Sequence, residues 1–497
     1  MDNFNRRQLL QAASAVPGAV MLAQNAQAQA PAARTTVFTH TTVLVTADQV
    51  HDDVGLAIVN GKIAAMGPTD DILRQYPGAD VYDGRGKAVM PGLINCHAHL
   101  TATIERGFNE DFGFPNSAHL SVSPGRLLSA EERTLMASIG ILEAIKCGTT
   151  SFVEFASGIA PYAGMLASTG IRIYLTEGIA DTDTVSGPMS PETLAKSVPP
   201  VYSAAKRDEG MKRISDLYSA WHGKNNGRVS VFPAASLAET SSPELLKAVR
   251  AFAEAHDLGY TVHLQQSIAE NEYMKRHNGM TPIAFLDKAG FLGPRLFAAH
   301  CRYMEPDDFT ILGRSKCMVS HQAPMAADRG ADTPIPELRA AGNTIVYGSD
   351  NNTNDIFEVM RVAMLSERLH RKADTVPGLH PQPEDVFEDC TVGGAKATHK
   401  EQQLGSLAVG KTADLIVLNT QRAHLVPCGR ILSAWIHNGQ PSDIESVMVD
   451  GQFIMRAGKV LTMDEAAIIA EADKVGKRVW AQVKAAGPIP IPGRPRA

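Results

Sequence analysis

The chain has 497 residues, of which 44% are hydrophobic. This length accommodates one barrel of roughly 250 to 350 residues together with a small second domain. The formal net charge of -6 gives no sign of a basic surface, so we expect no nucleic-acid partner. The six cysteines are widely spread and resemble small buried apolar residues more than a disulfide framework.

Residues 1–30 carry the pattern of a twin-arginine export signal. Arg6 and Arg7 precede a short apolar run, and small residues near position 28 offer a cleavage site. The alternatives are a surface arginine pair before a disordered tail, or a membrane span, which Pro17 and Gly18 in a short run disfavour. We therefore predict a protein without a membrane span that is exported to the periplasm after folding.

Short alternating β runs occupy both ends of the remaining chain, in residues 36–90 and 444–460. We expect residues 31–88 and 404–465 to pair into one small β-sandwich, with a barrel of residues 89–403 inserted between them. A C-terminal helix and a mobile tail are expected in residues 466–497.

Strand-like runs alternate with helical stretches through residues 89–403, which predicts an α/β fold with a parallel (β/α)8 TIM barrel. The first four strands are expected at 89–97, 149–155, 172–177 and 229–235, and four more end near residues 263, 300, 321 and 350. In this architecture the reactive groups lie at the carboxyl ends of the strands.

The ends of these strands carry candidate metal ligands. His97 and His99 are separated by one residue after an apolar run, so in a strand they point the same way and can bind one cation together. An isolated pair could equally be surface or core histidines. Three later runs end on His263, His300 and Asp350, which would complete a five-point nitrogen and oxygen site suited to Zn²⁺ or Fe²⁺.

Other segments accompany these ligands in a recognisable order. They are PGLINCHAHL at 91–100, VSH at 319–321 with Pro324 shortly after, GSD at 348–350, and GSLAVGKTADLIVL at 405–418. With them the chain resembles the amidohydrolase superfamily from about residue 36 to 460, in the branch of triazine hydrolases, guanine deaminase and adenosine-type deaminases. The resemblance implies metal ligands at His97, His99, His263, His300 and Asp350, and an unliganded His321 that polarises the bond under attack.

The same resemblance predicts how many metal ions are bound. Amidohydrolases with two metals bridge them through a modified lysine on the fourth strand, and residues 228–236 contain no lysine. We therefore expect one divalent ion, Zn or alternatively Fe. It would lower the pKa of a bound water from about 15.7 towards about 7, with Asp350 accepting the proton and His321 donating to the developing oxyanion.

One position departs from the deaminases of this branch, which carry a glutamate three residues after the histidine of the fifth strand. This chain has Gln266, and an amide cannot carry a proton. Gln266 could act in catalysis or orient the substrate. Glu154 and Glu177 are candidate substitutes that could instead form structural ion pairs, and Arg106 could contact the substrate or form a salt bridge at the barrel rim.

These residues predict a metal-dependent hydrolase of a non-peptide C-N bond in a small nitrogen-containing heterocycle. Deamination and amide, urea or ring hydrolysis both remain open. The alternatives are an amide, urea or lactam hydrolase without deaminase activity, and a catalytically silent ligand-binding relative, which Gln266 alone favours. The expected partners are a small-molecule substrate and further copies of the chain in a homo-oligomer.

Overall fold

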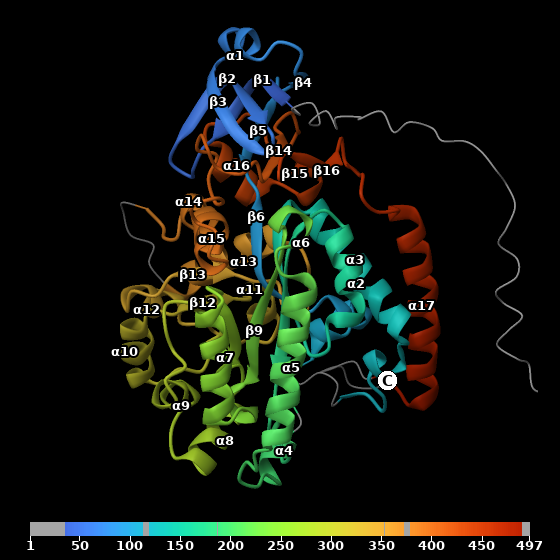
Figure 1. Ribbon diagram of the computed structural model, residues 1–497, viewed down its shortest axis with the longest axis vertical. Helices are drawn as coiled ribbons and strands as arrows, with labels where there is room; N and C mark the ends of the chain where they lie inside the picture. The colour runs from blue at the N-terminus through green and yellow to red at the C-terminus, as the bar shows by residue number, and fades with distance from the viewer. Residues whose placement is uncertain (1–34, 113–118, 186, 352, 372–377, 490–497) are drawn as a thin grey trace, which may run out of the picture.

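The computed structural model describes residues 35–112, 119–185, 187–351, 353–371 and 378–489 (Figure 1). The expected export signal, residues 1–30, and the end of the expected tail, residues 490–497, lie outside the described residues. The described chain contains an eight-stranded sheet and a separate nine-stranded sheet, both flanked by helices. Within these ranges no helix is both long and apolar enough to cross a membrane.

The eight-stranded sheet is parallel, and its strands follow one another in chain order. They are β6 (Leu93–Ala98), β7 (Thr149–Ala156), β8 (Arg172–Ile179), β9 (Val229–Leu237), β10 (Tyr260–Leu264), β11 (Leu296–His300), β12 (Met318–His321) and β13 (Ile345–Tyr347). The first and last strands meet where Ala98 pairs with Asp350, and the Asp350 amide donates to the His97 carbonyl at 3.0 Å. The predicted TIM barrel is therefore confirmed.

Helices cover the outside of the barrel, so its strands are buried on both faces, as parallel strands require. Among these helices, α2 begins with a capping box in which the side chains of Ser129 and Glu132 accept from each other's backbone amides. The helices of this unit are α2 (Ala130–Lys146), α3 (Ala160–Ser168), α4 (Pro191–Ala195), α5 (Ala204–Trp221), α6 (Lys224–Gly227), α7 (Pro243–Ala255), α8 (Ile268–Asn278), α9 (Pro282–Lys288), α10 (Pro306–Ser315), α11 (Ala323–Asp328), α12 (Ile335–Ala340), α13 (Ile356–Arg371), α14 (Pro383–Glu388), α15 (Gly394–Ala397) and α16 (Ile431–Asn438).

The second sheet combines the two ends of the chain, and in Figure 1 it lies above the barrel. Its strands are β1 (Thr35–Leu44), β2 (Val50–Val59), β3 (Lys62–Pro68), β4 (Asp80–Asp83), β5 (Lys87–Pro91), β14 (Leu415–Asn419), β15 (Ile444–Val449), β16 (Gln452–Arg456) and β17 (Lys459–Val460), with helix α1 (Thr69–Gln75) beside them. The antiparallel pairing of β5 with β14 joins the two ends. Hydrogen bonds thus connect all nine strands, a continuity that the predicted β-sandwich did not specify. They bury their own apolar cluster, which includes Phe38, Leu56 and Leu415.

The C-terminal helix α17 (Glu465–Ala486) lies along the side of the barrel next to α2 (Figure 1). Its buried Val479 belongs to a small apolar cluster with Ile104 and Met136. The indole of Trp480 donates to the Ile104 carbonyl at 3.0 Å. This helix therefore packs on the loop that directly follows the His97 strand.

Candidate metal centre

The five candidate ligands gather at the carboxyl ends of the barrel strands. His97 lies near the end of β6 and His99 directly after it, His263 lies in β10, His300 ends β11, and Asp350 follows β13. Their ligand atoms form two overlapping groups, in each of which all atoms lie within 4.8 Å of one another. One group joins His97, His99 and His263, and the other joins His97, His300 and Asp350.

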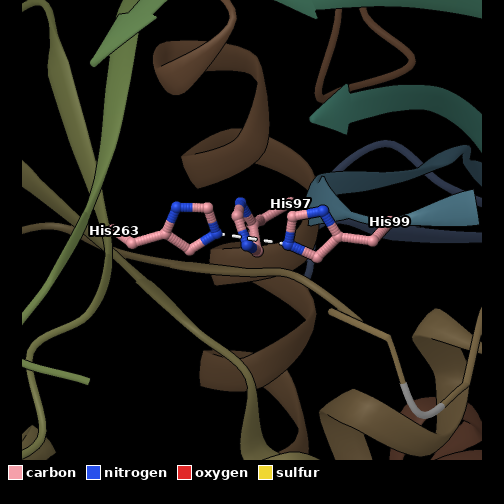
Figure 2. Close-up of side chains that lie close together, drawn as sticks. All are labelled: His97, His99 and His263. Carbon is pink, nitrogen blue, oxygen red and sulfur yellow. Dashed lines mark hydrogen bonds between the residues drawn. The ribbon is translucent and has the colours of Figure 1, made fainter. Parts of the chain in front are cut away.

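The facing ring nitrogens of His99 and His263 show that this cluster fits a cation. Figure 2 shows the two rings on either side of His97, with their Nε2 atoms 3.2 Å apart. Each Nδ1 donates to a backbone carbonyl, His99 to Phe155 at 2.8 Å and His263 to Ser236 at 2.7 Å. A carbonyl only accepts, so both Nε2 atoms present lone pairs to each other, an arrangement that a shared cation stabilises.

Two further observations support the same fit. Both ring nitrogens of His97 are buried without a hydrogen-bond partner among the described residues. Asp350 places Oδ1 3.6 Å from His99 Nε2 and Oδ2 3.8 Å from His300 Nε2. A buried nitrogen without a partner is costly, and a metal ion would satisfy one of the two ring nitrogens of His97.

Burial lowers the pKa of His97, His263 and His300 and keeps these three rings in the neutral form that binds metal ions. Burial, and after it the neighbouring His99, lower the pKa of His263 to about 4. The pKa values of His97 and His300 also lie well below the ordinary value, first because of burial and then because of the neighbouring His263 for His97 and the charge of Arg302 for His300.

Unusual backbone conformations orient the side chains of two candidate ligands. His300 has φ of 83° and Asp350 has φ of 62°, in a region that side chains other than glycine rarely adopt. The His300 amide donates to Oε1 of Gln322 at 3.1 Å, and the Asn95 amide group donates to Ser349 Oγ at 2.8 Å across the β6 and β13 seam. Sequence patterns alone did not reveal Asn95 or Gln322 as supports of the site.

His321 ends β12, is 4% exposed, and lies on the strand between those of His300 and Asp350. Burial, and after it the charges of Arg302 and Arg339, lower its pKa to about 3. The ring is therefore neutral at physiological pH and can donate one N-H group. The role of an electrophilic donor, which the resemblance implies for His321, requires this neutral state.

A cavity of about 360 Å³ opens over the ligand cluster. Besides four of the five candidate ligands, its walls include Thr240, Gln266, Met325, Arg329 and Asn351. Among the described residues that line it, Asp350 is the one carboxylate. The cavity thus holds a metal-ligand set at its floor and mostly neutral or cationic groups on its walls.

Gln266 lies in the wall of this cavity and is 6% exposed. Its Nε2 is buried and has no hydrogen-bond partner in the part of the chain that the structure describes. The backbone amides of Gln265 and Gln266 donate to the two carboxyl oxygens of Glu270, each at 2.8 Å. Glu270 thereby holds the loop that presents Gln266. The sequence analysis did not identify this support, which the Ser267-x-x-Glu270 spacing, typical of a helix start, could have indicated.

Glu154 lies behind the cavity wall instead of lining it. Its carboxyl group accepts from the Leu100 amide at 2.9 Å and from the Tyr162 hydroxyl at 2.9 Å. Burial raises its pKa to about 8. These contacts hold the loop after His99, so the geometry favours the structural alternative for this residue.

Glu177 and Arg106 also have structural partners. Glu177 accepts from the Gly158 amide at 2.9 Å and from Nε of Arg213 at 3.0 Å. Arg106 forms an ion pair with Glu143. Neither residue belongs to the described cavity lining. Of the four predicted substrate contacts, the structure brings only Gln266 to the cavity.

Comparisons with known proteins agree with this architecture. The sequence model of the Amidohydrolase family matches residues 88–454. The chain is 29% identical over 433 residues to a 5-methylthioadenosine/S-adenosylhomocysteine deaminase of Desulforudis audaxviator, covering 85% of this chain and 94% of the relative. It is 30% identical over 438 residues to a 5'-deoxyadenosine deaminase of Methanosarcina acetivorans, covering 86% and 94%.

Solved structures share the fold. A zinc-bound adenosine deaminase from Xanthomonas campestris superposes with a TM-score of 0.78 at 22% identity, covering 90% of this chain and 98% of that one. An atrazine chlorohydrolase from Arthrobacter aurescens TC1, complexed with zinc, gives a TM-score of 0.77 at 20% identity, covering 89% and 100%. At these identities the similarity concerns the fold alone.

Proposed function

Because this chain belongs to the amidohydrolase family, we propose that it uses one divalent ion, zinc or alternatively iron, to hydrolyse an amide or urea bond in a small nitrogen-containing molecule. It is a metal-dependent hydrolase of C-N bonds other than peptide bonds. The proposal concerns the number and identity of the ions and the kind of bond. A single ion is supported by β9, whose sequence VSVFPAASL contains no lysine to bridge a second one.

His97, His99, His263, His300 and Asp350 would hold the ion. When bound, it supplies acidity to a water molecule and polarises the carbonyl group of the substrate. Asp350 accepts the proton of the attacking water and returns it to the leaving nitrogen. The neutral His321 ring donates its N-H to the oxygen that gains charge, a contribution of a few kcal/mol in a dry site.

The observation that carries the choice of bond is Gln266 in the cavity wall. Deaminating an aromatic ring requires a group that protonates a ring nitrogen, and an amide cannot do so. Glu154 and Glu177, the predicted substitutes, are engaged behind the wall. An amide or urea does not need ring protonation, because Asp350 can protonate the leaving nitrogen. Gln266 Nε2 can donate to a substrate carbonyl instead.

A second candidate is deamination of an adenosine-type nucleoside, which the names of the two relatives favour. It requires an acid other than Gln266. Measuring ammonia release from aminopurines and aminopyrimidines beside amine release from amides and ureas separates the two activities. Faster ammonia release would overturn the proposed amide or urea activity. Metal binding without turnover of either class would support a silent ligand-binding relative.

Metal content tests the single site. Purified protein should carry about one equivalent of Zn or Fe per chain, measured by elemental analysis, and His300→Ala should lose both metal and activity. His277→Ala is a matched control, because His277 lies on α8 and bonds Ser197 away from the ligand cluster. Two tightly bound ions per wild-type chain would contradict the proposal.

We also propose that the protein acts in the periplasm as a homo-oligomer. Arg6 and Arg7 and the apolar run after them support export of the folded chain. Export after folding would let the metal be loaded before transport. Analytical ultracentrifugation of the mature chain measures its oligomeric state. A monomer at micromolar concentration would contradict the proposed homo-oligomer.

A further inference from the structure

A buried carboxyl group behind the cavity wall has no role in the mechanism described above. Glu239 lies in the short 3-10 helix η5 (Ala238–Thr240), next to Thr240 of the cavity wall, and is 1% exposed. Both of its carboxyl oxygens are buried without a hydrogen-bond partner in the described part of the chain. Because a buried charge without partners is costly, this environment favours the neutral form of Glu239.

Glu239 lies close to Glu270, whose carboxyl group supports Gln266. The helix η5 packs against α8, on which Glu270 lies, and against β10, which leads to Gln266. Burial, and after it the charge of Glu239, raise the pKa of Glu270 well above its ordinary value. Burial also raises the pKa of Glu239 to about 7, although the nearby amides of Glu239 and Met189 act to lower it. Two negative charges here would repel each other, because both groups are shielded from water.

The cations on the elements around η5 do not balance this pair. The titratable groups of β10, α8 and α9 are Tyr260, His263, Glu270, Glu272, Tyr273, Lys275, Arg276, His277, Asp287 and Lys288, and β9 has none. Lys275 pairs with Glu305, Arg276 donates to a backbone carbonyl at 2.8 Å, and Lys288 is exposed. Asp181, whose amide donates to the Thr240 carbonyl at 3.0 Å, adds a further carboxylate. A shared proton is therefore the remaining way to lower the charge of the pair.

Hydrogen-bond donors indicate which of the two groups holds this proton. The oxygens of Glu270 accept from the amides of Gln265 and Gln266, each at 2.8 Å, and such donors favour the charged form. The oxygens of Glu239 have no donor in hydrogen-bond geometry, which favours the neutral form. A proton on Glu239 and a charge on Glu270 thus fit the surrounding donors better than the reverse.

We propose that Glu239 is a positioning residue that stays protonated beside the Glu270 carboxylate, so that Glu270 can hold Gln266 in the cavity wall. When Glu239 loses its proton at higher pH, the two charges repel, and the hold of Glu270 on the two loop amides weakens. Gln266 then loses its fixed orientation toward the cavity. The proposal rests on the proposed function only in taking this cavity as the substrate site.

Infrared difference spectroscopy tests where the proton lies. Subtracting the spectrum of Glu239→Gln from that of the wild type at pH 6 cancels all shared groups, including Glu154. The difference should show the carbonyl band of one protonated carboxyl group, and this band should disappear as pH rises past neutrality. The same subtraction with Glu270→Gln should show a carboxylate band instead. A protonated band that is lost in Glu270→Gln and kept in Glu239→Gln would overturn the proposal.

Amide hydrogen exchange tests the positioning role without a substrate. In the wild type, protection of the Gln265 and Gln266 amides, corrected for intrinsic exchange, should fall about tenfold or more between pH 6 and pH 9, because one pKa unit of coupling corresponds to a factor of ten. Glu239→Gln cannot ionise and should keep its protection. Glu272→Gln, exposed on the same helix, is the matched control and should follow the wild type. Protection that falls equally in Glu239→Gln, or that does not fall in the wild type, would overturn the proposal.

Glu239→Met is a second variant that decides the outcome if Glu239→Gln does not fold. Methionine has a similar length and needs no hydrogen-bond partner, so Glu239→Met should also keep the protection at high pH. Loss of protection at every pH in a folded Glu239→Met would show that the loop needs the carboxyl group itself, and would refute the proposal. Neither measurement needs turnover, so a protein without amide hydrolysis would refute the proposed function and leave this inference standing.

Discussion

Replacing Gln266 by glutamate tests the departure that separates this chain from the deaminases it resembles. The new carboxyl group would lie in a wall where the side chain is 6% exposed, beside a loop already held by the Glu270 carboxyl. Glu154, which is similarly buried, has its pKa raised to about 8 by burial. We expect the new group to be mostly protonated at neutral pH for the same reason.

The expected loss in kcat/KM follows from the number of hydrogen-bond donors that the substitution removes. A protonated carboxyl group has one donor where the Gln266 amide has two, and a neutral hydrogen bond contributes about 0.5 to 1.5 kcal/mol. Amide hydrolysis by Gln266→Glu should therefore show kcat/KM about 2- to 12-fold lower at pH 6. As pH rises through the pKa of the new group, it loses its last donor and gains a charge, so the deficit should widen. A bound cation nearby would shift this change to lower pH.

The assay is kcat/KM from pH 5.5 to 9.5 with the zinc-loaded enzyme, on an amide and on an aminopyrimidine. Gln421→Glu makes the same chemical change at an exposed position after β14, and should leave both profiles unaltered. The reasoning would be refuted if Gln266→Glu hydrolysed amides faster at every pH. It would also fail if the wild type released ammonia rapidly and Glu154→Gln abolished this release while metal content stayed intact.

Two further predictions concern stability and export. Because the folded-state pKa of Glu154 is about 8, above the ordinary 4.5, the folded protein binds more protons than the unfolded chain between these values, and stability should fall as pH rises through this window. Denaturant titrations measure the free energy of unfolding at each pH. Glu154→Gln should reduce the decline of this free energy with pH by up to about 1.4 kcal/mol per pH unit. The exposed Glu272→Gln should leave the decline unchanged. A reporter fused to residues 1–30 should be exported, and changing Arg6 and Arg7 together to lysine should block this; persistent export would contradict the twin-arginine assignment.

The sequence by itself determined the features that depend on local spacing. The i, i+2 spacing of His97 and His99 sets both side chains on one side of a strand, whatever the rest of the fold does. Apolar runs ending on His263, His300 and Asp350 predicted ligands at the carboxyl ends of parallel strands, and the structure brings their atoms together. The gathering of these side chains could be predicted because strand periodicity and the βα order are local properties that the chain repeats.

Only the tertiary structure decided the roles of the polar groups behind and around those ligands. Glu154 and Gln266 both lie close to apolar runs in the sequence. The Glu154 carboxyl group nevertheless accepts a hydrogen bond from the Leu100 amide, whereas Gln266 lines the cavity. Arg302 and Arg329 follow the neighbouring strands β11 and β12, and the charge of Asp350 acts on both of them. Burial and hydrogen-bond partners arise from contacts distant in the chain, so residue type and spacing cannot specify them.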